Sequence, residues 1–171
     1  MTSPRPSPAY TKAHDARRSL WFAALAGIGV MTGIDEIVFH QLLQWHHFFD
    51  HATPGIGILS DGLLHAAELL AIVIGAFLLI DLAQRRLLAT RWAWAGVFLG
   101  MGVFQLFDGI VSHKILRIHQ IRYGVDLLVY DLIWNLSALG LLLIGMGLVR
   151  RARRSEALHY WVHLHFLIAG Y

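Results

Sequence analysis

The sequence contains no cysteine and few charged residues. The absence of cysteine excludes disulfides, thiolate-bound zinc or iron–sulfur clusters, and covalent attachment of c-type haem. A metal site in this chain would therefore use nitrogen and oxygen ligands, or at most methionine sulfur. Only 15% of the 171 residues are charged and 57% are hydrophobic, which is far more apolar than a soluble domain. Phosphate-cradling glycine loops, dinucleotide fingerprints and nucleophile–base pairs are also missing, which argues against nucleotide enzymes and hydrolases.

Four long apolar runs indicate an all-α integral membrane protein. They cover residues 20–39, 63–80, 92–107 (extendable to His113) and 127–149, and each is close to the length needed to cross about 30 Å of hydrocarbon. The first run is too long for a cleavable signal peptide and contains Asp35 and Glu36. We therefore expect a bundle of four transmembrane helices in a lipid bilayer.

The basic residues predict the orientation of these helices. They flank the spans in three groups, before the first helix, between the second and third, and after the fourth, a distribution typical of cytoplasmic segments. We therefore expect a multi-pass protein of the bacterial inner membrane with both termini in the cytoplasm. The net charge of +3 is then a topology signal, and no nucleic-acid partner is expected.

The chain is expected to have a membrane domain and two short ends. Residues 1–18 are rich in proline and serine and are predicted to be disordered and cytoplasmic. Residues 19–150 form the transmembrane domain, with repeat halves at about 20–83 and 92–149. Residues 151–171 combine a basic flank with an amphipathic segment that contains His159 and His163, and we expect an interfacial helix there.

The two halves of the membrane domain resemble each other. Residues 26–48 align with residues 99–121 at a constant shift, and the next helices align if the second outer loop is three residues shorter. Such an internal duplication predicts two helical hairpins of the same orientation, related by a pseudo-twofold axis along the membrane normal. The matched polar pairs are Asp35 with Asp108, His40 with His113, His46 with His119, Asp61 with Asp131, and His65 with Asn135.

The strongly polar residues of the spans are expected at one depth, near the outer face. Counting about 1.5 Å per residue from Leu20 places Asp35 about 22 Å into the bilayer and His40 near its outer boundary. Ionisable groups at this depth are costly unless they are paired. In a regular α-helix Asp35 and His40 point about 140° apart, whereas Asp35 and His46 point about 20° apart. Either the helix breaks before His46 and His119, or the side chains lie in different shells of the site, some in direct contact with its centre and others behind them.

A transition-metal site between the outer helix ends is the sharpest hypothesis, with either one or two ions. Imidazole groups bind copper, zinc, iron and nickel, and carboxylates complete such sites or orient the ligating histidines. The principal ligands are expected to be His40, His65 and His113. The further candidate metal ligands are His46 and His119 at the rim, together with His47, Glu36, Asp35, Asp61, Asp108 and Asp131.

Three other interpretations remain open for these polar residues near the outer helix ends. Asp and His could pair across helices as hydrogen-bonded clamps without any metal. Two histidines from different helices could hold haem b, although the nearby carboxylates argue against it. A proton or ion pathway is a further alternative, but it should also place polar residues in the inner leaflet.

The polar segments also resemble a known family. The stretches "DEIVFHQLLQWHH", "DGLLH", "FDGIVSHKILRIHQIR" and "YDLIWN" look like the hallmark segments of an uncharacterised family of bacterial predicted membrane proteins, and the likeness covers about residues 27–147. The resemblance implies a four-helix inner-membrane protein without an assigned reaction. It also implies proximity to genes for assembly of copper-dependent cytochrome c oxidase, which favours copper as the metal.

Taken together, these features predict a metal-binding membrane protein. We expect a role in metal handling or in maturation of a respiratory oxidase, with the oxidase or its assembly factors as partners. The alternative is a membrane metalloenzyme, an oxidoreductase with a dinuclear centre. The sequence leaves open whether the protein is an enzyme and whether it forms a homo-oligomer.

Overall fold

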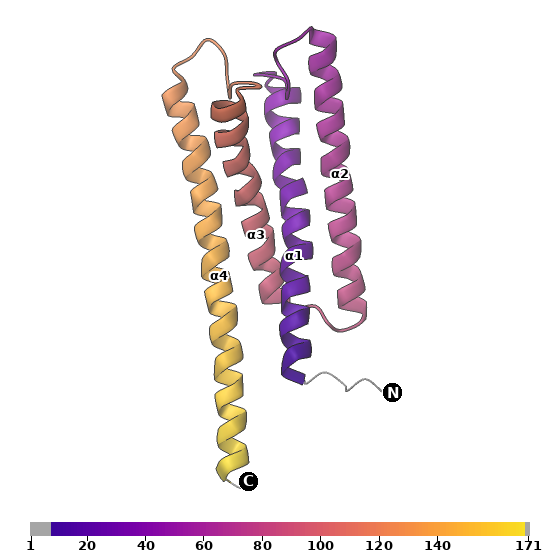
Figure 1. Cartoon of the computed structure of the whole chain (residues 1–171), viewed down its shortest axis with the longest axis vertical. Helices are drawn as coiled ribbons and strands as arrows, with labels where there is room; N and C mark the ends of the chain where they lie inside the picture. Colours follow the sequence, from indigo (N-terminus) through magenta and orange to yellow (C-terminus); the bar gives the residue numbers. More distant parts are fainter. Residues whose placement is uncertain (1–7, 170–171) are drawn as a thin grey trace.

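The structure is a computed structural model in which residues 8–169 are described, with side chains described for residues 12–158. Helices account for almost all of this part of the chain, and strands are absent from it (Figure 1). Two of the membrane helices change from α-helix to π-helix at their C-terminal ends. The elements are α1 (Pro8–Asp35), η1 (Glu36–Leu42), α2 (Pro54–Gln84), α3 (Thr90–Phe107), η2 (Asp108–Leu116) and α4 (Leu127–Ala169).

The expectation of a four-helix membrane protein is confirmed. The described part of the chain has four helices that are long and apolar enough to cross a membrane, with α1 continuing into η1 and α3 into η2. The α1–α2 and α3–α4 loops lie at one end of the molecule, and the short α2–α3 loop lies at the other end (Figure 1). We call the end with the two longer loops the loop end.

The helices stand in the spatial order α2, α1, α3, α4. Helices α1 and α3 pack against each other at the centre, α2 packs against α1, and α4 packs against α3. In the described residues, the backbone of α2 does not approach α3 or α4, and α1 meets α4 through side chains such as Met31 and Trp134. The outer helices therefore keep apolar side chains exposed, such as Phe77 on α2 and Leu143 on α4, as expected for surfaces solvated by lipid.

Glycines allow the central helices to approach closely. A Cβ atom at Gly27 would collide with the carbonyl oxygen of Val97, and one at Gly100 would collide with the carbonyl oxygen of Ala24. The two contacts are equivalent in the repeat, because Gly27 aligns with Gly100 and Ala24 aligns with Val97. Small residues at such crossings let two membrane helices pack backbone to backbone. The predicted pseudo-twofold relation between the hairpins is thus present in the packing itself.

Both ends of the chain contain more helix than predicted. Helix α1 begins at Pro8, within the segment 1–18 that was expected to be disordered, and proline is well suited to a first helical position. Residues 1–7 lie outside the described part.

Helix α4 continues without interruption to Ala169, so the expected interfacial helix is an extension of the fourth membrane helix. The indole of Trp92 donates a hydrogen bond of 2.7 Å to Glu156. The side chains of His159 and His163 lie outside the described residues.

Candidate metal centre

The π-helical segments occupy equivalent places in the two repeats. Helix α1 widens at Glu36, directly after Asp35, and α3 widens at Asp108. A π-helix forms i→i+5 hydrogen bonds in place of i→i+4 bonds, and it is frequently found at functional sites. The wider turn brings residues five apart towards the same face. It therefore removes the wide angular separation between Asp35 and His40 that a regular α-helix would impose.

The wider turn brings each aspartate close to the histidine that follows it. The carboxylate of Asp35 lies 3.8 Å from Nε2 of His40, and that of Asp108 lies 3.1 Å from Nε2 of His113. All four side chains are buried, with residue exposures of 2–4%. The repeated spacing of Asp and His in the sequence is thus a spatial contact in both halves.

A left-handed residue ends each π-helical segment and turns the chain back over the helix end. Gln44 has φ 51° and Arg117 has φ 52°, and the two positions are equivalent in the repeat. The following amides are also equivalent, since Trp45 donates to the carbonyl of Phe39 and Ile118 donates to that of Ser112. The helix therefore ends before His46 and His119, which is the first of the two options that the sequence left open.

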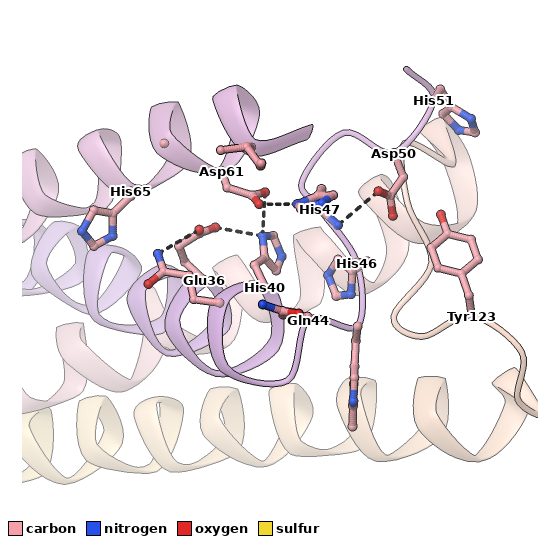
Figure 2. Close-up of a pocket in the computed structure, with 14 residues that line it drawn as sticks. Glu36, His40, Gln44, His46, His47, Asp50, His51, Asp61, His65 and Tyr123 are labelled. Atoms are coloured by element: carbon pink, nitrogen blue, oxygen red, sulfur yellow. Dashed lines mark hydrogen bonds and ion pairs between the residues drawn. The ribbon is translucent and has the colours of Figure 1, made fainter. Parts of the chain in front are cut away.

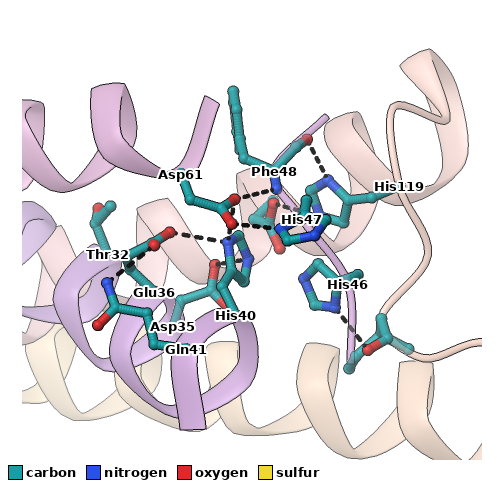
Figure 3. Close-up of polar contacts among 12 residues, drawn as sticks. Thr32, Asp35, Glu36, His40, Gln41, His46, His47, Phe48, Asp61 and His119 are labelled. Atoms are coloured by element: carbon teal, nitrogen blue, oxygen red, sulfur yellow. Dashed lines mark hydrogen bonds and ion pairs between the residues drawn. The ribbon is translucent and has the colours of Figure 1, made fainter. Parts of the chain in front are cut away.

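His46 and His119 hold the two loops together through reciprocal hydrogen bonds. Nδ1 of His46 donates to the carbonyl of Ile121 at 2.9 Å, and Nδ1 of His119 donates to the carbonyl of Phe48 at 2.8 Å. Because a carbonyl oxygen can only accept, Nδ1 carries the hydrogen in both rings. The lone pair of each neutral imidazole is then on Nε2, which points back over the helix ends (Figure 3).

Four imidazole rings meet at this point. The rings of His46 and His119 stack with centroids 4.5 Å apart, the His40 ring lies 4.4 Å from that of His46, and the His113 ring lies 4.7 Å from that of His119. Each of the four Nε2 atoms is buried and lacks a hydrogen-bond partner among the described residues. Unsatisfied buried polar atoms are uncommon, and a cluster of them calls for a ligand or a bound ion. We call this group the four-histidine cluster.

The donor atoms of the cluster are spaced closely enough for a metal ion. The ligating atoms of His46, His113 and His119 lie within 4.8 Å of one another, and so do those of Asp35, His40 and His46. Neighbouring donors around an ion bound at about 2.1 Å lie about 3.4 Å apart. Side-chain rotations that shorten the separations by up to about 1 Å would therefore bring these atoms into coordination distance.

His46 has the electrostatic properties of a neutral ligand. Burial, followed by the positive charge that His40, His119 and His113 can carry, lowers the pKa of His46 from its usual value to about 2. Its imidazole is therefore uncharged at neutral pH. Only an uncharged imidazole has the lone pair that coordinates a metal ion.

A second polar group lies on the other edge of the His40 ring. Nδ1 of His40 faces Glu36 at 2.8 Å and Asp61 at 3.1 Å. Nδ1 of His47 lies 2.6 Å from the other oxygen of Asp61, and the amide of Phe48 donates to Asp61 at 2.7 Å. Ionised carboxylates only accept hydrogen bonds, so Nδ1 of His40 carries the hydrogen and Nε2 remains free for the four-histidine cluster.

A cavity of about 1150 Å³ opens beside this second group (Figure 2). Glu36, His40, Asp61 and His47 line its inner part, and the side chain of Tyr123 lies towards the loops. His46 also lines the cavity, so two members of the four-histidine cluster border it.

The structure brings together most of the residues that the sequence singled out, but it assigns two of them differently. His46 and His119 were expected at the rim, and both are buried, with exposures of 5% and 1%. Their loops fold inward over the helix ends, which no helical periodicity could predict. His65 was expected as a principal ligand. Its side chain is 39% exposed and pairs with Glu68 at 2.7 Å, because His65 lies a turn deeper on the outer helix α2.

Asp131 also plays a different part from its repeat equivalent. It pairs with the ammonium group of Lys114, and its carboxylate lies 3.9 Å from Nδ1 of His113. Asp61 in the first half receives His40, His47 and a backbone amide instead. The two hairpins therefore have the same backbone geometry but different electrostatic surroundings.

The comparisons with known proteins identify a family but no characterised relative. No curated protein and no solved structure matches this chain. The family described as "Predicted membrane protein (DUF2243)" matches residues 23–152, which include most or all of each span, both π-helical segments and the four-histidine cluster. The match covers most of the chain and agrees with the resemblance noted in the polar segments. The protein therefore belongs to this family of predicted membrane proteins, whose function is unknown.

Proposed function

We propose that the protein binds a transition-metal ion in the four-histidine cluster. The observation that carries this proposal is a chain of four neighbouring imidazole rings whose buried Nε2 atoms have no hydrogen-bond partner among the described residues. Two of the rings are oriented by carbonyl groups and one by carboxylates, the arrangement that commonly positions metal-ligating histidines. Asp35 and Asp108 would complete the coordination from the side of the membrane core.

The geometry favours a metal over the other readings of the histidine layer. A clamp of Asp and His pairs would leave few polar atoms unsatisfied, whereas here Nε2 of His113 lies 3.1 Å from Asp108 without hydrogen-bond alignment. Haem b would need a slot for its macrocycle between two histidines, and the stacked rings of His46 and His119 leave no such slot.

The donor set favours copper, with zinc or iron as alternatives. Imidazole and carboxylate ligands suit divalent ions of the late first row, and the affinity of such sites is highest for Cu²⁺. Thiolate ligands, which select Cu⁺, are absent because the chain has no cysteine. We therefore propose an oxidised copper ion as the preferred occupant.

We place this centre at the outer face of the bacterial inner membrane. The loop end carries the cluster, and the arginines of the α2–α3 loop lie at the opposite end. By the positive-inside rule, that opposite end and both termini are cytoplasmic. A copper site at the outer face would serve metal handling or the maturation of a respiratory oxidase, as the family resemblance suggests.

A second candidate function is supported by the cavity beside His40. A filled storage or transfer site needs no chamber for a small molecule, whereas an oxidoreductase does. The cavity of about 1150 Å³ would let a polar substrate reach the metal past His40. Turnover of a redox-active substrate by the loaded protein would favour this membrane metalloenzyme over a copper carrier.

Metal analysis of the purified protein tests the proposal. The protein should be produced without a histidine tag, loaded with Cu²⁺ in detergent and freed of loose metal by gel filtration. We expect the H46A/H119A double variant to lose the bound ion of the cluster and to weaken its binding by more than about 100-fold, since loss of an orienting partner alone typically costs 10–100-fold. H65A is the control, and it should retain the metal. Equal metal in the wild type and the double variant would contradict the proposal.

A further inference from the structure

We propose that a second divalent cation binds at the inner end of the cavity, held by Glu36, Asp61 and His47. This site, the mouth site, lies against the Nδ1 edge of His40, and the four-histidine cluster lies against the Nε2 edge (Figures 2 and 3). The inference rests on the proposed function, because it adds a second ion beside the first.

Charge is the first reason to place a cation here. Glu36 is fully buried and Asp61 is 9% exposed, and the two carboxylates converge on a single imidazole nitrogen. One Nδ1 hydrogen cannot neutralise two carboxylates, and uncompensated buried charges are strongly destabilising. A divalent ion in the four-histidine cluster would be balanced by Asp35 and Asp108, leaving Glu36 and Asp61 without a matching positive charge.

The second repeat shows what a cation does at the equivalent place. Asp131 aligns with Asp61, and Lys114 aligns with Gln41. The ammonium group of Lys114 pairs directly with Asp131, so this half of the protein carries its own cation. In the first half, Gln41 instead donates its amide to Glu36 at 3.2 Å. Gln41 is neutral, and no fixed cation pairs with Glu36 or Asp61 among the described residues.

The remaining differences between the halves also favour a cation site in the first half. Where the first half has Glu36, the second has Gly109, and where the first has His47, the second has Gln120. Each change removes a metal-ligating group from the half that contains a lysine. The half without a lysine therefore has two carboxylates and an additional imidazole.

The spacing of the donor atoms also supports an ion at this place. Oε2 of Glu36 is buried and shares the single Nδ1 of His40 with Asp61, and the donor atoms of Glu36, His40 and Asp61 lie within 4.8 Å of one another. The cavity provides access from the loop end. Carboxylate-rich sites with one imidazole select borderline or hard divalent ions such as Zn²⁺, Mn²⁺ or Cu²⁺. We therefore expect a divalent ion and no monovalent copper.

The Q41K variant tests the mouth site, because it gives the first half the lysine of the second. Gln41 is exposed and lines the cavity, so a lysine fits there. Q41M is the matched control, with a side chain of similar length and no charge. Each protein is titrated with CuSO₄, and the bound copper per chain is measured after removal of free metal. We expect two copper ions in the wild type and in Q41M, and one in Q41K.

The H46A/H119A variant separates the two proposals. If both sites exist, this variant retains one copper ion, and adding Q41K removes it. A wild type that binds one ion, unaffected by Q41K and lost in H46A/H119A, would overturn the mouth site and leave the metal centre intact. A wild type whose single ion is lost in Q41K but kept in H46A/H119A would overturn the metal centre and retain the mouth site.

Discussion

Removal of copper from the loaded protein is expected to lower its melting temperature by about 8–16 °C. A ligand that binds only the folded state stabilises it by about 4 kcal/mol when its free concentration is 1,000 times the dissociation constant. For a chain of this size, 1 kcal/mol corresponds to about 2–4 °C. The shift arises because the ion neutralises Asp35 and Asp108, and because it bonds to the buried Nε2 atoms that otherwise lack partners.

Differential scanning fluorimetry in detergent, with copper-loaded and chelator-treated protein, measures this shift. The H46A/H119A/Q41K variant, which lacks both proposed sites, is the control, and its melting temperature should respond to the chelator by no more than a few degrees. If the wild type melts at the same temperature in both states, the histidines are a hydrogen-bonded clamp and need no ion.

Replacement of Asp35 by asparagine should change the stability of the metal-free and the loaded protein in opposite directions. Asp35 is 2% exposed, and its nearest ionic partner is Nε2 of His40 at 3.8 Å. Without a metal ion, this carboxylate is a buried charge with weak compensation, which is unfavourable. We expect D35N to stabilise the metal-free protein by about 1–3 kcal/mol and to weaken copper binding by about 10–100-fold.

Chemical unfolding of the metal-free variant and copper titration of the folded variant measure the two effects separately. D81N is the control, because Asp81 lies on the exposed part of α2 and pairs with Arg85; it should leave both quantities nearly unchanged. A D35N protein that is less stable without metal would show that Asp35 and His40 form a structural pair.

The sequence predicted the membrane fold and the polar layer because both depend on regular periodicity. Four apolar runs determine four spans, and the duplicated Asp and His residues place ionisable groups at the same depth in both hairpins. The central position of α1 and α3 also agrees with the glycines at Gly27 and Gly100, where the two backbones touch. These features follow from residue type and spacing alone.

The arrangement within the site could not be predicted from the same rules. A regular α-helix separates Asp35 from His40 by angle, and only the widening of the helix at Glu36 removes that separation. The inward course of the loops depends on left-handed residues at Gln44 and Arg117, neither of which is a glycine that would have signalled the turn. His65 looked equivalent to the other histidines, but its direction depends on how α2 packs against α1.

X-ray absorption at the copper edge of the loaded, tag-free protein shows which side chains hold the ion. We expect a spectrum with nitrogen and oxygen neighbours at about 2.0 Å and the outer-shell scattering of at least three imidazole rings. In the H46A/H119A variant, the imidazole scattering of the buried ion should disappear. A spectrum without imidazole scattering, or one that is identical in the wild type and the variant, would show that the four histidines do not hold the metal.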